Sequence, residues 1–240
     1  MMKRSVAAVA AFMACALLPA AAHAKVIEIG EPSDPFTPAC PGSPCFVVDR
    51  TTGYQAKVGT NRGLMTAPQS GLLVAWSVGL SKPNDKQIAY FENTKNGGKG
   101  YGPSQAAITV LTVGAHLHDT VKAMGPLVTL TPYFGGTAQF PLPQAIPVKK
   151  GDLIAITVPT WAPMLQVGFA GDTSWRASRA KNKCSPKFTD NQTAQTKIGQ
   201  KAQYACLYRT ARLAYTATLI PYAKKTNPSS TKKNKRAIER

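Results

Sequence analysis

The stretch LLVAWSV, residues Leu72–Val78, decides the fold class of this 240-residue chain. Its larger apolar residues occupy every second position and are Leu72, Val74, Trp76 and Val78. A β-strand would place all of them on one face, whereas an amphipathic helix repeats its apolar residues every three to four positions. The stretch therefore predicts a strand with one buried face and one face turned toward solvent.

The rest of the chain extends this β pattern. Leu213–Leu219 alternates in the same way, with Leu213, Tyr215, Ala217 and Leu219 on one face. Nineteen glycines and nineteen prolines are spread along the chain, and Val, Ile, Thr and Tyr dominate the segments between them. Short apolar segments separated by turn residues are typical of β-sandwiches and barrels. We therefore predict an all-β protein.

A turn followed by a strand refines this prediction. Within Ile146–Ile156, the segment Lys149–Asp152 is a turn that leads directly into an apolar strand, as in hairpins of jelly-roll proteins. We expect a single antiparallel β-sandwich of jelly-roll type over residues 46–222. Strands are expected at Phe46–Arg50, Tyr54–Val58, Gly71–Leu80, Gln87–Glu92, Ala106–Val113, Leu127–Pro132, Thr137–Leu142, Asp152–Val158, Leu165–Gly168, Gln203–Tyr208 and Arg212–Ile220.

The two ends of the chain differ from this core. Residues 1–24 combine two early basic residues, an apolar run and the motif Ala22-His23-Ala24, which is the pattern of a cleaved signal peptide. Residues 25–45 are expected to form an extended lead-in, and the basic residues 223–240 a disordered tail. No segment reaches the about 20 apolar residues of a transmembrane helix. These features predict a secreted, extracellular or envelope-associated protein.

Four cysteines follow the predicted signal peptide, and they are Cys40, Cys45, Cys184 and Cys206. An even number in an oxidising compartment indicates disulfides. Three pairings are possible. We favour Cys40–Cys45, which flank a tight turn, and Cys184–Cys206, whose loop closure would remove about 3 kcal/mol of unfolded-state entropy. The alternative is a structural zinc site, which would need paired Cys-x2-Cys segments that this chain lacks.

Positive charge is concentrated in two segments. The chain carries 29 Lys and Arg against 11 Asp and Glu, a formal net charge of +18. Residues 172–201 hold seven basic and two acidic residues, and residues 224–240 hold seven and one. The Arg176–Lys201 loop and the Lys224–Arg240 tail are therefore candidate contacts for cell-envelope polyanions or polysaccharide. No module for specific nucleic-acid recognition accompanies them. A tail that only solubilises the protein is the alternative.

Four aromatic residues near predicted turns are candidates for ligand binding, and they are Trp161, Trp175, Tyr133 and Tyr101. A sandwich displays its binding loops at such turns, and exposed aromatic rings there could stack on sugar rings. For Trp161 and Trp175 we favour the alternative that they cover the ends of the core.

Residue types for catalysis or metal binding are sparse. His116 and His118 would share one side of a strand, but Asp119, Asp152 or Asp172 would have to complete a metal site, so we favour a polar hairpin end. No Gly-x-Ser-x-Gly elbow, His-Glu-x-x-His helix or clear pair of buried carboxylates can be recognised. We therefore predict no catalytic residues, no metal and no cofactor.

The chain resembles uncharacterised secreted β-sandwich proteins of actinobacteria at Thr157–Pro163 and Trp175–Arg179. The resemblance extends to Gly71–Val78 and to the Cys184 and Cys206 pair, across most of the predicted domain. It implies a jelly-roll domain similar to carbohydrate-binding modules and an exported location. It implies no catalytic residues.

Three hypotheses for function follow from these observations. The leading one is a secreted, non-enzymatic protein with an extracellular or envelope-associated binding role whose ligand the sequence does not identify. The second is a carbohydrate-binding module that stacks glycans on Trp161 and Trp175. The third is a hydrolase with a site near His116 and His118.

Overall fold

The computed structural model describes residues 25–30, 35–40, 42, 45–185 and 192–223. The chain is mostly antiparallel β, with 48% strand and 11% helix, which confirms the predicted β class. The predicted signal peptide and the Lys224–Arg240 tail lie outside the described residues. Within the described ranges, no helix is long and apolar enough to cross a membrane.

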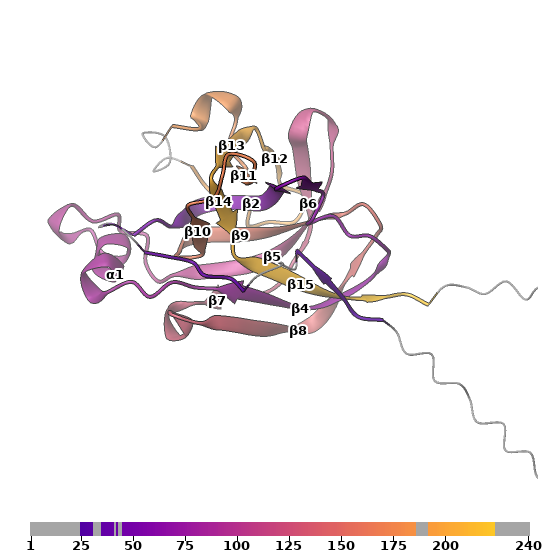
Figure 1. The fold of residues 1–240 in the computed structure, drawn as a ribbon, viewed down its shortest axis with the longest axis horizontal. Coiled ribbons are helices and arrows are strands. Elements are labelled where there is room, and N and C mark those ends of the chain that lie inside the picture. Colours follow the sequence, from indigo (N-terminus) through magenta and orange to yellow (C-terminus); the bar gives the residue numbers. More distant parts are fainter. Residues whose placement is uncertain (1–24, 31–34, 41, 43–44, 186–191, 224–240) are drawn as a thin grey trace, which may run out of the picture.

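Two sheets share one apolar core. The smaller sheet has the strand order β1-β15-β4-β8, namely Ile27–Ile29, Tyr215–Pro221, Gly71–Gly79 and Thr137–Val148. The larger sheet has the order β12-β6-β5-β9-β2-β11-β13, namely Lys201–Gln203, His118–Met124, Gln105–Thr112, Leu153–Ala162, Val48–Val58, Ser174–Ala177 and Cys206–Arg209. Figure 1 shows β4, β8 and β15 on one side of the molecule and the strands of the larger sheet above them.

Shorter elements complete the fold. Strand β3 pairs with β2, β7 pairs with β5, and β10 and β14 form a ribbon of their own; these strands are Asn61–Arg62, Val128–Thr129, Leu165–Val167 and Ala211–Leu213. The one α-helix among the described residues is α1, Asp85–Glu92. Short 3-10 turns lie at Lys95–Gly97, Ala115–Leu117, Thr131–Tyr133 and Lys181–Lys183.

The two alternating stretches form the neighbouring central strands of the smaller sheet. In β15, the buried Tyr215 donates a hydrogen bond from its hydroxyl to the carbonyl of Ile154 in the larger sheet (3.0 Å) and so links the two layers. In β4 the predicted face is wrong at its start, because a register shift follows Leu73. Such a bulge adds one residue to the strand, so Leu73 is fully buried and Leu72 is only half-buried.

The segment Gln87–Glu92, predicted as a strand, lies in helix α1. The Asn84 side chain accepts a hydrogen bond from the Gln87 backbone (3.0 Å), and the Gln87 side chain accepts one from the Asn84 backbone (2.8 Å). This reciprocal capping satisfies two amide groups that the first turn of a helix leaves unpaired. Phe91, three positions after Ile88, is buried and anchors the helix to the core.

Other predicted strands differ from the observed ones. Strands β6 and β11 were not expected, and Leu127–Pro132 contributes only the two residues of β7. Phe46–Arg50 and Tyr54–Val58 merge into the single strand β2. The predicted strand Gln203–Tyr208 divides at Tyr204, and its halves, β12 and β13, lie at opposite edges of the larger sheet. Only Tyr204, which is buried, and Ala205 separate the two strands, so the larger sheet curls and brings its two edges close together.

Both disulfides occur with the favoured pairing, Cys40–Cys45 and Cys184–Cys206. The segment between Arg176 and Lys201 is not wholly the basic surface loop that was predicted. Several of its side chains are buried, namely Ser178, Arg179, Ala194 and Gln195. The backbone amide of Gln195 donates to the Thr52 hydroxyl on β2 (3.1 Å), so the described part of the loop packs on the larger sheet.

Candidate functional site

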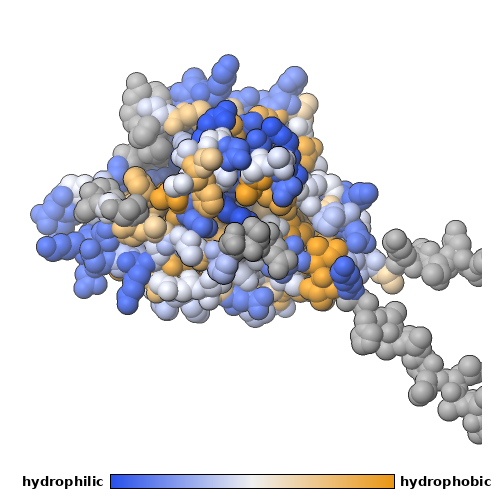
Figure 2. Space-filling model, in the orientation of Figure 1, coloured by the Kyte–Doolittle hydropathy of each residue, from blue (hydrophilic) through white to orange (hydrophobic). Residues whose placement is uncertain are grey.

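A groove of about 620 Å³ opens between the segment that follows Cys45, helix α1 and strands β10, β11, β13 and β14. Its residues are Cys45, Phe46, Val47, Val48, Asp49, Tyr90, Phe91, Lys99, Leu165, Val167, Trp175, Arg179, Cys184, Tyr208, Arg209, Thr210 and Ala211. Figure 2 shows apolar surface, in orange, where Figure 1 places β10 and β14. The groove therefore combines an apolar floor with a small number of charged groups.

An aromatic pair forms part of the floor. Trp175 of β11 lies opposite Tyr208 of β13 in the antiparallel register, and the two rings stack with centroids 4.7 Å apart. Directly opposed residues on neighbouring strands project to the same side of a sheet, which explains why both reach the groove. Trp175 is only 5% exposed, while Tyr208 is half-buried. Tyr208 therefore offers the larger free aromatic surface of the pair.

Arg179 places a positive charge beside this aromatic pair. Its side chain is 4% exposed, and its guanidinium donates to the Tyr208 hydroxyl (2.8 Å), to the Asp49 carbonyl (2.9 Å) and to the Asp49 carboxylate (3.2 Å). Its Nε–H is buried and has no hydrogen-bond partner among the described residues. A buried donor without a partner costs about 1–3 kcal/mol.

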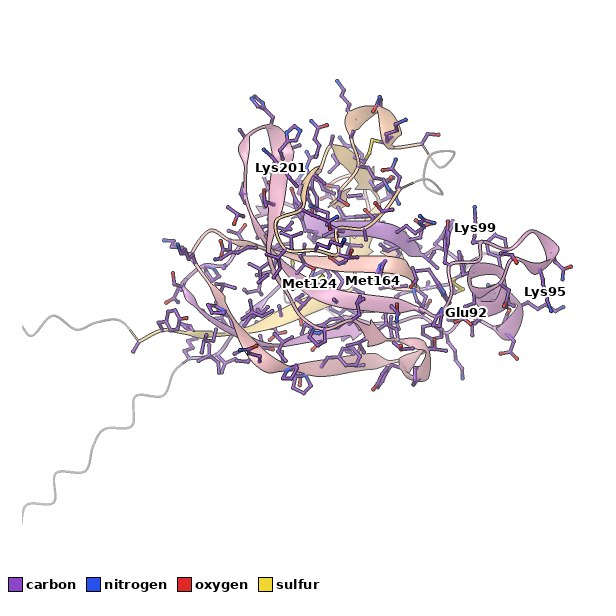
Figure 3. The ribbon with its side chains drawn as sticks, turned by 180° about the vertical axis from the view of Figure 1, so that it is seen from behind. Glu92, Lys95, Lys99, Met124, Met164 and Lys201 are labelled. Atoms are coloured by element: carbon purple, nitrogen blue, oxygen red, sulfur yellow. A yellow bond between two sulfur atoms is a disulfide. The ribbon has the colours of Figure 1, made fainter. Side chains whose placement is uncertain are left out.

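The mouth of the groove carries further apolar and basic side chains. Phe46 is 54% exposed, and Tyr90 is half-buried in the same lining. Lys99 lies on the loop that follows α1 (Figure 3), and Arg209 ends β13. With Arg179, the described residues of the lining include three basic side chains and one carboxylate, that of Asp49.

Trp161 supports the groove from beneath and does not line it. The ring is fully buried, stacks on Phe91 with centroids 4.8 Å apart, and donates from Nε1 to the Gly102 carbonyl (3.0 Å). The predicted sugar-stacking role of Trp161 is therefore wrong, because neither face of its ring is free. The favoured alternative, coverage of the core, describes it correctly, and Phe91 is the groove residue that it positions.

The two tyrosine candidates also lie outside the lining. Tyr101 is half-buried, and its hydroxyl donates to the Asp49 carboxylate (3.4 Å), so it acts on the groove through Asp49. Tyr133 is 44% exposed and packs edge-on against Phe140 of β8, with ring centroids 5.0 Å apart. Of the four predicted aromatic residues, the structure brings Trp175 alone into the groove.

The two histidines do not share a face of one strand. His116 lies exposed in the turn before β6 with a φ of 54°, and His118 begins β6, half-buried. Asp152 stabilises the predicted Lys149–Asp152 turn by accepting from the Lys149 amide (2.7 Å). Across the described ranges, no group of three or more His, Cys, Asp or Glu is arranged to hold a metal ion.

Sequence reasoning missed Phe46, Tyr90, Arg179 and Tyr208. A signal for Tyr208 was present, because it lies two positions after Cys206 and so on the same face of β13 as the disulfide. Arg179 was counted only among the basic residues of the Arg176–Lys201 loop, because its partner Asp49 is 130 positions away in the sequence. No local pattern in the sequence marks Phe46 or Tyr90 as a groove residue.

The fold and the groove together define a mainly antiparallel β protein with two disulfides and an aromatic, positively charged groove. Comparison of the chain with protein-family models, with curated proteins and with solved structures gives no match.

Proposed function

We propose that this protein is a secreted, non-enzymatic β-sandwich of jelly-roll type that binds acidic polysaccharide in the groove. The observation that carries the proposal is the stacked pair of Trp175 and Tyr208, with the buried guanidinium of Arg179 beside it and its Nε–H unpartnered among the described residues. The ligand class is glycans with carboxylate or sulfate groups.

Each part of the groove matches one part of such a ligand. The C–H face of a sugar ring packs on an aromatic ring, and Phe46 and Tyr208 offer exposed aromatic surface at the mouth and on the floor. A carboxylate or sulfate group accepts strong charge-assisted hydrogen bonds, and a guanidinium group such as Arg209 is well suited to donate them. Neutral glycans would use only the first interaction.

The lining supports binding more directly than hydrolysis. Glycoside hydrolysis generally uses two carboxyl groups at a defined separation. Among the described residues of the lining, Asp49 provides the one carboxyl group. It forms an ion pair with Arg179 and accepts a hydrogen bond from the Tyr101 hydroxyl. An acid committed to a buried cation is poorly suited to donate a proton to a leaving group.

Export and architecture form the other part of the proposal. Two disulfides persist best in an oxidising compartment, which agrees with the signal-peptide pattern of residues 1–24. Two sheets around one core agree with the jelly-roll sandwich that the resemblance to actinobacterial secreted proteins implies. The Lys224–Arg240 tail is proposed as a second contact with envelope polyanions.

A glycan array that carries neutral, uronate-bearing and sulfated glycans tests the proposal. We expect the disulfide-bonded chain from residue 25 to bind the acidic glycans, and Phe46→Ala and Arg209→Gln each to weaken this binding. Tyr133→Ala, an exposed aromatic residue outside the groove, is the matched control and should bind normally. Absence of binding to every acidic glycan, or unchanged binding by both groove variants, would overturn the proposal.

A further inference from the structure

A second hollow, of about 430 Å³, lies on the opposite side of strands β11 and β13 from the groove. Side chains alternate along these strands, so that Trp175 and Tyr208 line the groove while Arg176 and Leu207 line the second hollow. Arg209, at the end of β13, borders both. Apart from Arg209, the second hollow therefore has its own lining, on the other face of these strands.

Among the described residues that line this hollow, basic side chains outnumber acidic ones. The basic residues are Lys57 of β2, Arg62 of β3, Arg176 of β11 and Arg209 of β13, and the one acidic residue of the lining is Asp119 at the start of β6. A concave surface lined mainly by one sign of charge focuses the electrostatic field and raises the local concentration of counter-ions. The arrangement favours an anion that carries more than one charge.

One donor of the lining, Arg176, is held in place, and a second, the Tyr54 hydroxyl, keeps its proton. The half-buried guanidinium of Arg176 donates to the carbonyls of Tyr204 (3.0 Å) and Ala205 (3.4 Å), which fixes its position against the wall. Tyr54 lies opposite Arg176 in the β2–β11 register, and burial raises the pKa of its hydroxyl to about 12. That hydroxyl is therefore protonated at neutral pH and can donate a hydrogen bond.

The turn at the mouth of the hollow is strained. His116 and Leu117 both have left-handed backbone conformations, with φ of 54° and 64°, and Leu117 lines the hollow. Such conformations cost residues with side chains about 1–3 kcal/mol each and cluster at ligand sites. Asp119, 1% exposed, holds this turn closed by accepting from the Gly114 amide (3.0 Å).

We infer that this hollow is a binding site for a phosphate group, held by Lys57, Arg62, Arg176 and Arg209 and by the Tyr54 hydroxyl. The phosphate is either free inorganic phosphate or a phosphate ester of an envelope polymer, since both present the same tetrahedral oxyanion. The site lies on the other face of β11 and β13 from the acidic-glycan groove, and Arg209 is the residue that borders both.

Calorimetric titration of the disulfide-bonded chain with inorganic phosphate at constant ionic strength tests this inference. We expect Lys57→Gln with Arg62→Gln to weaken phosphate binding about tenfold or more, because two charge-assisted contacts are lost. Lys149→Gln with Lys150→Gln removes the same charge from an exposed turn outside the hollow and should change binding less than about twofold. If the two double variants weaken phosphate binding equally, the effect comes from the overall charge of the protein, and the proposed site is wrong.

Asp119→Asn provides a test in the opposite direction. The amide oxygen can still accept from the Gly114 amide, while a negative charge leaves the hollow, so we expect phosphate to bind more tightly than in the unaltered protein. Weaker binding by a folded Asp119→Asn variant would contradict the inference, as would the same affinity for phosphate and chloride.

A phosphorylated oligosaccharide that binds more tightly than inorganic phosphate would identify the polymer ester as the source. The Phe46→Ala variant should retain phosphate binding, which separates this site from the groove.

Discussion

The indole ring of Trp175 lies 4.7 Å from the phenol ring of Tyr208, with the two planes inclined by 29°. The pair bridges β11 and β13, and the Tyr208 hydroxyl accepts a hydrogen bond from Arg179 and donates one to the Cys184 carbonyl (3.2 Å). A stacked pair, a buried cation and a disulfide are thus joined through one tyrosine. The two hydrogen bonds hold Tyr208 in the lining of the groove.

Tyr208→Phe retains the aromatic ring but removes the hydroxyl. Arg179 then loses one acceptor, and the Cys184 carbonyl loses one donor. We expect the free energy of unfolding to fall by about 1–2 kcal/mol, measured by urea denaturation. Tyr133→Phe, at an exposed ring, is the control and should change stability by less than about 0.5 kcal/mol. Equal stability of Tyr208→Phe and the unaltered protein would mean that these two hydrogen bonds contribute nothing.

Asp49→Asn removes the negative partner of Arg179. The cation is 4% exposed and would remain buried without a counter-charge, so we expect a loss of about 3 kcal/mol in the free energy of unfolding. Asp172→Asn changes an exposed carboxylate and should be nearly neutral. If both variants have the same stability in urea, then solvent already screens the pair between Asp49 and Arg179.

Asp119 should make stability depend on pH. Burial raises the pKa of its carboxyl above the ordinary value, although the Gly114 amide and Arg176 act in the opposite direction. Between the ordinary pKa of 3.8 and the raised one, the folded state binds more protons than the unfolded state, so this group makes stability fall as pH rises. Below 3.8 the penalty is absent, and above the raised pKa it is complete.

Asp119→Asn should remove this contribution and leave the other titrating groups in place. We expect the difference in unfolding free energy between the variant and the unaltered protein to shift in favour of the variant as pH rises through this window. Urea denaturation at a series of pH values measures the difference. A difference that is constant with pH, or that shifts in the other direction, would contradict the role assigned to burial.

The two disulfides should differ in their contribution to stability. Cys184 and Cys206 are 22 positions apart, and Cys40 and Cys45 only five, so loop-closure entropy gives about 3.4 and about 2 kcal/mol respectively. Replacing each pair by serine and measuring urea denaturation should show the larger loss for Cys184 and Cys206. The larger loss at Cys40 and Cys45 would show that native contacts outweigh chain entropy here.

Local sequence patterns predicted the strands in which apolar residues alternate regularly with other residues. The alternation of Leu213–Leu219 places Tyr215 and Leu219 in the core, as expected. The same argument failed at Leu72, because a bulge that no local pattern signals shifts the register. For helix α1, the signal was present in the spacing of Asn84 and Gln87, a capping box that precedes the apolar residues.

The groove was less predictable than the fold because it is built from distant segments. Asp49 and Arg179 are 130 positions apart, and only the pairing of β2 with β11 brings them together. The favoured Cys184–Cys206 pairing, which the structure confirms, joins the basic loop to the predicted strand that contains Tyr208. It did not predict that Arg179 turns inward, since a buried cation depends on a partner that sequence spacing does not reveal.

The most direct measurement for the proposed function is a calorimetric titration with two oligosaccharides of equal length, one carrying uronate groups and one neutral. We expect the uronate oligosaccharide to bind more tightly, with an affinity that falls as salt is raised, because charge-assisted contacts are screened. Phe46→Ala should weaken the binding of both oligosaccharides, and Arg209→Gln should weaken mainly that of the charged one. Equal affinity for the two oligosaccharides, or no binding of either, would contradict the assignment of the groove to acidic polysaccharide.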